Sequence, residues 1–256
     1  SKLAPLTIAA LSDATMAALA TAGKLANLTP AQVAALPAST IDSVPTTVLA
    51  TLTDAQVAGL SDAQLAALTP AQMAAMATAG NLDNLTAAQI SKLAPLTIAA
   101  LSDATMAALA TAGKLANLTP AQVAALPAST IDSVPTTVLA TLTDAQVASL
   151  TTAQLAALTD AQMAAMATAG NLDSLTPAQV AALPASTIDS VPATVLATLT
   201  DAQVASLTTA QLAALTDAQM AAMATAGNLD SLTPAQVAAL PASTIDSVPA
   251  TVIDNL

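Results

Sequence analysis

The sequence places a large apolar residue at every eighth position along its whole length. Thirty-two such anchors, from Leu3 to Leu256, follow one another without a miss, and only five steps are nine residues long. A short period held from one terminus to the other is typical of repeat arrays and not of a compact domain with one core. We therefore predict a single continuous array over residues 1–256, cut from a longer repetitive protein. Its unit, counted from the anchor, is called an octad below.

Longer repeats are superimposed on the octads. Residues 1–50 recur unchanged as 91–140, and residues 121–180 recur as 178–237 with one change. Successive Thr-Ala-Gly segments lie 57 or 33 residues apart, which is a whole number of octads plus one residue. Repeats this similar indicate that selection acts on bulk properties and not on one unique site.

The composition lacks most of the side chains on which enzymes depend. The chain has no His, Cys, Arg, Glu or aromatic residue, and its only ionisable side chains are 16 Asp and 4 Lys, a net charge of -12. Nucleophile–base pairs need residue types or pockets that are missing here. We expect no enzyme activity, no cofactor and no metal. The acidic balance argues against nucleic acid, and no stretch of about 20 apolar residues predicts a membrane span.

Fourteen of the octads carry a signal for the start of a helix. In residues 28–35, Thr29 is the expected N-cap, Pro30 the first helical residue and Gln32 the third. This is a capping box: the Thr oxygen accepts the Gln backbone N–H, and the Gln side chain accepts the Thr N–H. The motif occurs fourteen times, at Thr29, Thr53, Ser61, Thr69, Thr86, Thr119, Thr143, Thr151, Thr159, Thr176, Thr200, Thr208, Thr216 and Thr233.

Each capped octad predicts a helix of about six residues that stops before the next cap. Helices shorter than about 12–15 residues are unstable alone, so these must pack on neighbours. The anchor and the sixth residue, such as Val57 or Leu65, are expected to share one core, with Met73 and Met76 filling it. We predict an all-α fold, a solenoid or superhelix of short helices built on the eight-residue repeat.

Two kinds of octad depart from this pattern. In the units that begin at Leu36 and Val44, Pro directly follows the anchor. This predicts extended backbone before Pro and one tight turn after it. Where a unit is nine residues long, the helix should run longer and end at a left-handed glycine, as at Gly80.

A resemblance to a known family lies in residues 28–60, which read LTPAQVAALPASTIDSVPTTVLATLTDAQVAGL. They resemble the short-helix units of the mesothelin, stereocilin and otoancorin family, which alternates L-S/T-P-x-x-L units with V-P-x-S-I units in the same eight-residue step. Through the repeats the resemblance covers essentially the whole chain. It implies an extracellular superhelical array used in cell-surface adhesion or in attaching matrix gels to cells.

Three Asn-Leu-Thr motifs are candidate N-glycosylation sites, at Asn27, Asn84 and Asn117. The alternative is that Asn ends one helix and Thr caps the next, so that the motif arises from the boundary between two helices. In two later repeats the corresponding residue is Ser174 or Ser231.

The turns after three long helices offer oxygen ligands, at Asp83, Asp173 and Asp230. Calcium takes six to eight oxygens, and three acidic turns lying one above another would share an ion. The alternative is structural, with the neighbouring Asn as a helix C-cap and Asp as the next N-cap.

These features favour a structural role. We expect a secreted, extracellular protein that forms a stiff rod, or a filament joined head to tail through Leu3–Leu11 at one end and Val248–Leu256 at the other. The alternative is an adhesion or binding module whose concave face holds a protein or glycan. The expected partners are the chain itself and a matrix or cell-surface protein.

Overall fold

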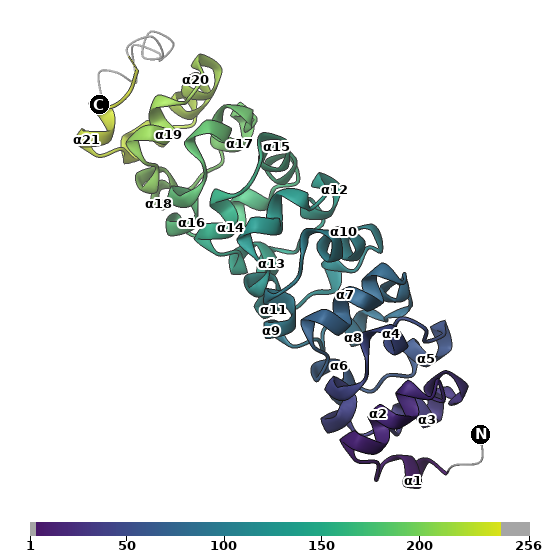
Figure 1. Cartoon of the computed structure of the whole chain (residues 1–256). Helices are drawn as coiled ribbons and strands as arrows, with labels where there is room; N and C mark the ends of the chain where they lie inside the picture. The colour runs from purple at the N-terminus through teal and green to yellow at the C-terminus, as the bar shows by residue number, and fades with distance from the viewer. Residues whose placement is uncertain (1–3, 242–256) are drawn as a thin grey trace. The chain divides into compact units, whose positions relative to one another are not determined.

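The structure is a computed structural model that describes residues 4–241, and within this range every regular element is a helix (Figure 1). The predicted all-α class is confirmed for these residues. They form 21 α-helices, most of four to six residues, and eight 3-10 helices. The chain divides into two compact units, residues 1–133 and 134–256.

The first unit consists of short helices joined by a few extended residues at each anchor. Its elements are α1 (Pro5–Ile8), α2 (Asp13–Thr21), η1 (Leu25–Asn27), α3 (Pro30–Ala34), η2 (Ala38–Ser43), α4 (Thr46–Leu49), α5 (Asp54–Ala58), α6 (Asp62–Ala66), α7 (Pro70–Thr78), η3 (Asn81–Asn84), α8 (Ala87–Ile90), α9 (Pro95–Ala99), α10 (Asp103–Thr111), η4 (Leu115–Asn117), α11 (Pro120–Ala125) and η5 (Ala128–Ser133).

The order of elements from α3 to η3 of the first unit recurs within the second unit. The elements of the second unit are α12 (Thr136–Leu139), α13 (Asp144–Ser149), α14 (Thr152–Ala156), α15 (Asp160–Thr168), η6 (Asn171–Ser174), α16 (Pro177–Ala182), η7 (Ala185–Ser190), α17 (Ala193–Leu196), α18 (Asp201–Ser206), α19 (Thr209–Ala213), α20 (Asp217–Thr225), η8 (Asn228–Ser231) and α21 (Pro234–Val237).

All fourteen predicted capping boxes are present. In a representative box, the backbone N–H of Gln56 donates to Thr53 Oγ1 at 3.4 Å, and the Thr53 N–H donates to Gln56 Oε1 at 2.9 Å. Each box satisfies two of the N–H groups that a helix start leaves without a partner. A new helix can therefore begin in every capped octad.

The nine-residue units also form as predicted. The long helices α2, α7, α10, α15 and α20 each span nine residues. Each is followed by a glycine with φ between 65° and 81°, a conformation that glycine adopts without the steric cost that a Cβ brings. Of the units with Pro after the anchor, the one at Val44 forms a single turn, α4 after Pro45, as predicted. The one at Leu36 is longer than predicted, because η2 after Pro37 is a six-residue 3-10 helix, about two turns at three residues per turn.

The sixth residue of the octad lies in the core. Val57, Leu65 and Met73 at this position are each 0% exposed, as is the anchor Met76, and most other anchors are buried as well. Within each unit, helices contact helices three octads further along the chain: α3 contacts α5, α4 contacts α7, α16 contacts α18 and α17 contacts α20. Short helices that are unstable alone are thus stabilised by neighbours at a fixed distance in sequence.

Candidate functional site

The Gln of the capping box makes a second set of contacts. Gln64 is 0% exposed, and its Oε1 accepts the Ser61 N–H at 2.7 Å. Its Nε2 donates to the carbonyls of Val33 at 2.7 Å and Leu36 at 2.9 Å, which lie 31 and 28 residues earlier. Both amide hydrogens and the amide oxygen are therefore paired, so this polar group is buried without leaving an unmet hydrogen bond.

The same contact recurs in both units, and we call the set the amide ladder. Each member is a buried amide that donates to a backbone carbonyl 28–32 residues earlier in the same unit. The members are Gln56, Gln64, Gln72, Asn81, Gln89 and Gln122 in the first unit, and Gln162, Asn171, Gln179, Gln203, Gln211, Gln219, Asn228 and Gln236 in the second.

Other residue types take this position where the octad has no Gln. Thr97 Oγ1 donates to the Leu68 carbonyl, and Lys114 Nζ donates to the Leu85 carbonyl, both at 2.7 Å and 29 residues apart. Lys114 follows Gly113 as Asn81 follows Gly80. The contact is therefore not confined to amides. It is not made in every octad without Gln, since Thr40 Oγ1 donates to the Pro37 carbonyl of its own octad.

The asparagines after the glycines differ from the helix C-caps considered from sequence. Asn81, Asn171 and Asn228 are buried residues that begin 3-10 helices, and each donates to a carbonyl 32 residues earlier. The left-handed glycine before each one already ends the long helix. Asp83 lies inside η3, and the next N-cap is Thr86.

The amide ladder was missed by reasoning from sequence, although composition held a signal for it. A capping box accepts Glu as readily as Gln, yet all fourteen boxes have Gln and the chain has no Glu. A carboxylate would accept the N-cap N–H but has no hydrogen to donate to a second carbonyl. The consistent choice of Gln therefore indicates that both ends of the amide are used.

The structure places the three glycosylation motifs differently. Asn27 is exposed at the end of η1, whereas Asn117 and Asn84 are half-buried at the ends of η4 and η3. Asn84 Nδ2 also donates to Asp54 Oδ1 at 3.0 Å. The geometry agrees with the alternative that the motif marks a boundary between helices, since each Asn ends a 3-10 helix and the Thr two residues later is an N-cap. Glycosylation itself stays a prediction.

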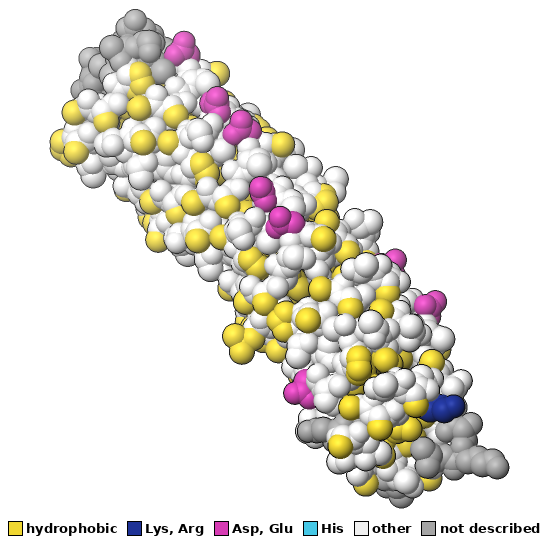
Figure 2. All heavy atoms as spheres, in the orientation of Figure 1, with side chains coloured by type: hydrophobic (Ala, Val, Ile, Leu, Met, Phe, Trp, Pro, Cys, Tyr) yellow, Lys and Arg dark blue, Asp and Glu magenta, His cyan; other side chains and the backbone are white. Residues whose placement is uncertain are grey.

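The charged side chains form no cluster in the part of the chain that is described. Asp83, Asp173 and Asp230 are exposed, and no group of three residues able to bind a metal occurs between residues 4 and 241. Figure 2 shows acidic side chains singly or in twos, with uncharged and apolar surface between them. One exposed ion pair joins Lys92 Nζ to Asp62 Oδ2 at 3.5 Å, and exposed pairs of this kind stabilise little.

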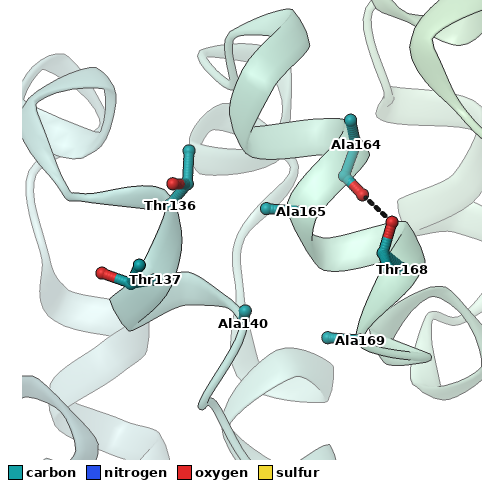
Figure 3. Close-up of a pocket in the computed structure, with 7 residues that line it drawn as sticks. All are labelled: Thr136, Thr137, Ala140, Ala164, Ala165, Thr168 and Ala169. Atoms are coloured by element: carbon teal, nitrogen blue, oxygen red, sulfur yellow. Dashed lines mark hydrogen bonds between the residues drawn. The ribbon is translucent and has the colours of Figure 1, made fainter.

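A shallow groove lies between α12 and α15 and is lined only by Thr and Ala (Figure 3). Its residues are Thr136, Thr137, Ala140, Ala164, Ala165, Thr168 and Ala169. A second groove between α17 and α20 has the equivalent residues 57 positions later: Thr194, Ala197, Ala221, Ala222, Thr225 and Ala226.

The hydroxyls at the ends of both long helices are already used. Thr168 Oγ1 donates to the Ala164 carbonyl and Thr225 Oγ1 to the Ala221 carbonyl, each at 2.8 Å. Neither groove is lined by a charged side chain. The grooves therefore offer methyl groups and few polar groups that would orient a small ligand.

Neither the described helices nor comparison with known proteins adds a functional assignment. Between residues 4 and 241, none of the helices combines the length and apolar character that crossing a bilayer requires. The chain matches no protein-family model, and no curated protein matches it.

Proposed function

We propose that this chain is a structural repeat protein: a stiff superhelical rod of short helices that acts as a spacer or scaffold. The amide ladder is the observation that supports the proposal. Each of its members ties one octad to backbone 28–32 residues earlier, so contacts stay local in sequence and recur along the chain. An array with such contacts derives its stability from neighbouring units and can be lengthened without changing its core.

The setting that we propose for the rod is extracellular. It is supported by the resemblance of residues 28–60 to the mesothelin, stereocilin and otoancorin family, which also suggests a matrix or cell-surface partner. In that setting Asn27, Asn84 and Asn117 are acceptors for N-linked glycans. Of the chain ends expected to join in a filament, Leu3 and Val248–Leu256 lie outside the described residues.

A second candidate function is a repeated binding surface. It is favoured by the Thr/Ala grooves, which recur 57 residues apart with equivalent linings except that Thr136 has no counterpart in the second groove. A partner with its own repeat would meet equivalent grooves in succession, and weak contacts would add through multivalency. Ala165→Lys and Ala222→Lys together would fill both grooves. Loss of binding to matrix components with unchanged helix content would support this candidate, and unchanged binding would count against it.

Deletion of one long repeat tests the rod. Removing residues 121–177 places Ala178 directly after Pro120, where Ala121 stood, so the join reproduces a native sequence. We expect the maximum dimension from small-angle X-ray scattering to fall by about a fifth, in proportion to the residues removed, with helix content per residue unchanged. A compact body would shrink by less than about a tenth, and that result would refute the rod.

A further inference from the structure

Leu96 is a large apolar side chain that lies on the surface of the first unit. It is 84% exposed, and it is the one large hydrophobic side chain found exposed among those that the structure describes. Leu96 occupies the fourth place of its octad, directly after Pro95 at the start of α9. Every other octad has Ala, Ser or Thr at this place, apart from the one with Leu6, the repeat copy of Leu96. The fold therefore does not need a leucine here, and the side chain is open to contact by another molecule.

A cationic side chain accompanies Leu96 on this surface. Lys92 lies four residues earlier, a stretch of backbone that spans at most about 14 Å, and its side chain is 48% exposed. Its partner within the chain is Asp62, in an exposed ion pair at 3.5 Å that stabilises little. The chain has only 4 Lys against 16 Asp, so a positive charge close to a large exposed apolar side chain is a rare combination in this molecule. We call residues 92–96 the Lys–Leu surface.

The groove between α12 and α15 is complementary in polarity to Leu96. It has a volume of about 460 Å³ and is lined by Thr and Ala, without a charged side chain. Ala165 and Ala169 point across it towards α12 (Figure 3). An apolar cavity of about 150 Å³ already holds a benzene molecule, so the groove has room for a leucine side chain. It lies within the second unit, and described octads precede and follow its residues.

Two carboxylates stand at one end of this groove. Asp144 and Asp173 are exposed, and each lies four residues beyond the last lining residue on its side of the groove. The equivalent segments of the first unit touch one another: Asn84, which follows the equivalent of Asp173, donates through Nδ2 to Oδ1 of Asp54, the equivalent of Asp144, at 3.0 Å. The groove therefore joins an apolar floor to a negatively charged end, the counterpart of an apolar side chain close to a cation.

We propose that the Lys–Leu surface of one copy of the chain docks on this groove of a second copy. Leu96 enters the groove and leaves water, which supplies the attraction. Lys92 exchanges Asp62 for Asp144 and Asp173 of the second copy, which fixes the orientation. A second copy is the occupant that the charges favour, because this chain carries both the cation with its apolar neighbour and the groove with its acidic end.

The contact joins different surfaces of the two copies. Each copy therefore keeps one of the two surfaces free, and further copies can add. The inference goes beyond the proposed rod, since a rod needs no contact between copies.

Sedimentation over a concentration series tests the contact. The reference chain carries Leu6→Ala, so that Leu96 is its only leucine at a fourth place. The series extends to about 1 mM, because a contact of this size is weak, in about 0.15 M salt, which screens charges more than about 8 Å apart. We expect the average mass of the reference chain to rise with concentration. Leu96→Ala should lower the association constant at least about tenfold, because the apolar contact is lost.

A matched control moves the leucine to another octad. Ala31 is exposed at a fourth place that also follows Pro, and Asn27 precedes the anchor there as Lys92 does before Leu96. We expect Leu96→Ala with Ala31→Leu to associate as weakly as Leu96→Ala alone, with unchanged circular dichroism in both. A reference chain that stays monomeric, or full association after the leucine is moved, would overturn the contact. Small-angle scattering of the monomer reports on the rod separately, since an elongated monomer leaves the rod intact.

Exchange of the charges tests which surface receives Lys92. Lys92→Asp should lower the association constant about threefold or more, whereas Lys24→Asp, the same change at another exposed residue, should leave it unchanged. Adding Asp144→Lys and Asp173→Lys to Lys92→Asp should recover most of the association, because opposite charges face one another again. In a chain that keeps Lys92, the same two changes should not strengthen association, which excludes a general effect of net charge. No recovery, or an equal loss with Lys24→Asp, would refute the assignment of the groove.

Discussion

Residues 4–32 and 94–122 share one sequence and differ in their surroundings. The long helix and its end are the same in both: α2 and α10 each span nine residues, and the following Gly23 and Gly113 have φ of 65° and 67°. Burial is not the same, because Leu109 is fully buried and Leu19 only half-buried. The comparison teaches that an octad forms its own helix, whereas its burial depends on the octads before it.

The largest effect is expected where a charge is put into the covered copy. Gln122 donates to the carbonyls of Ile90 and Leu93 and accepts the Thr119 N–H. Gln122→Glu keeps the acceptor and replaces the donor with a buried carboxylate oxygen, which we expect to cost about 3–5 kcal/mol at pH 7. Urea unfolding, with hydrogen exchange of α11 as a local probe, measures the loss.

The pH dependence of the stability of this variant shows how much of the cost comes from the buried charge and how much from the lost hydrogen bonds. Burial raises the pKa of the introduced carboxyl above its unfolded value of about 4.3. The loss of folding stability is therefore fully present above the raised pKa. It decreases as the pH falls from that pKa towards the pKa of the carboxyl in the unfolded chain. Gln122→Met, which removes the hydrogen bonds without a charge, should cost about 1–3 kcal/mol without this pH dependence. Equal stability of the two variants at pH 7 would contradict the prediction.

Two Leu→Ala substitutions at equivalent positions compare the two copies directly. Leu109→Ala removes a fully buried side chain and should cost about 3 kcal/mol. Leu19→Ala makes the same change at a half-buried position, and we expect about 1 kcal/mol there because less apolar area returns to water. Both are measured by urea unfolding at a concentration where the chain is monomeric. Equal losses would mean that the preceding octads do not determine burial.

A hydrogen-bond pair makes the same comparison with a smaller effect. Thr97→Val removes the donor to the Leu68 carbonyl and should cost about 1–2 kcal/mol, because a buried carbonyl loses a partner. Thr7→Val at the exposed copy should change stability by less than about 0.5 kcal/mol. Amide exchange in α9 and α1 reports the two sites separately. A cost at residue 7 equal to that at residue 97 would argue against the ladder contact.

A glycine pair should show no difference between the copies. Gly23 and Gly113 both have positive φ, and an added Cβ would meet no atom within 4 Å at either position. Gly23→Ala and Gly113→Ala should therefore each cost about 1 kcal/mol from backbone conformation alone. Thermal unfolding of both variants checks this. A clearly larger cost at residue 113 would show that local geometry also depends on the covering octads.

The part of the fold that sequence could predict is the part formed within eight or nine residues. The capping box at Thr53, the left-handed turn at Gly80 and the burial of Leu65 all follow from neighbours in the same octad. The amide ladder could not be predicted in the same way, because Gln64 reaches carbonyls 28 and 31 residues away. The sequence of a single octad does not indicate how many octads lie between two octads that are in contact.

Sequence alone was thus sufficient for where the fourteen capped helices start, where the long helices stop and which residues turn inward, because capping, glycine conformation and helical periodicity act over a few bonds. Packing decided which earlier carbonyl receives each Gln or Asn amide, and why Thr97 is buried when the identical Thr7 is exposed. The physical reason is that a side chain's burial and hydrogen-bond partners belong to the surface placed against it, and identical sequences meet different surfaces along one chain.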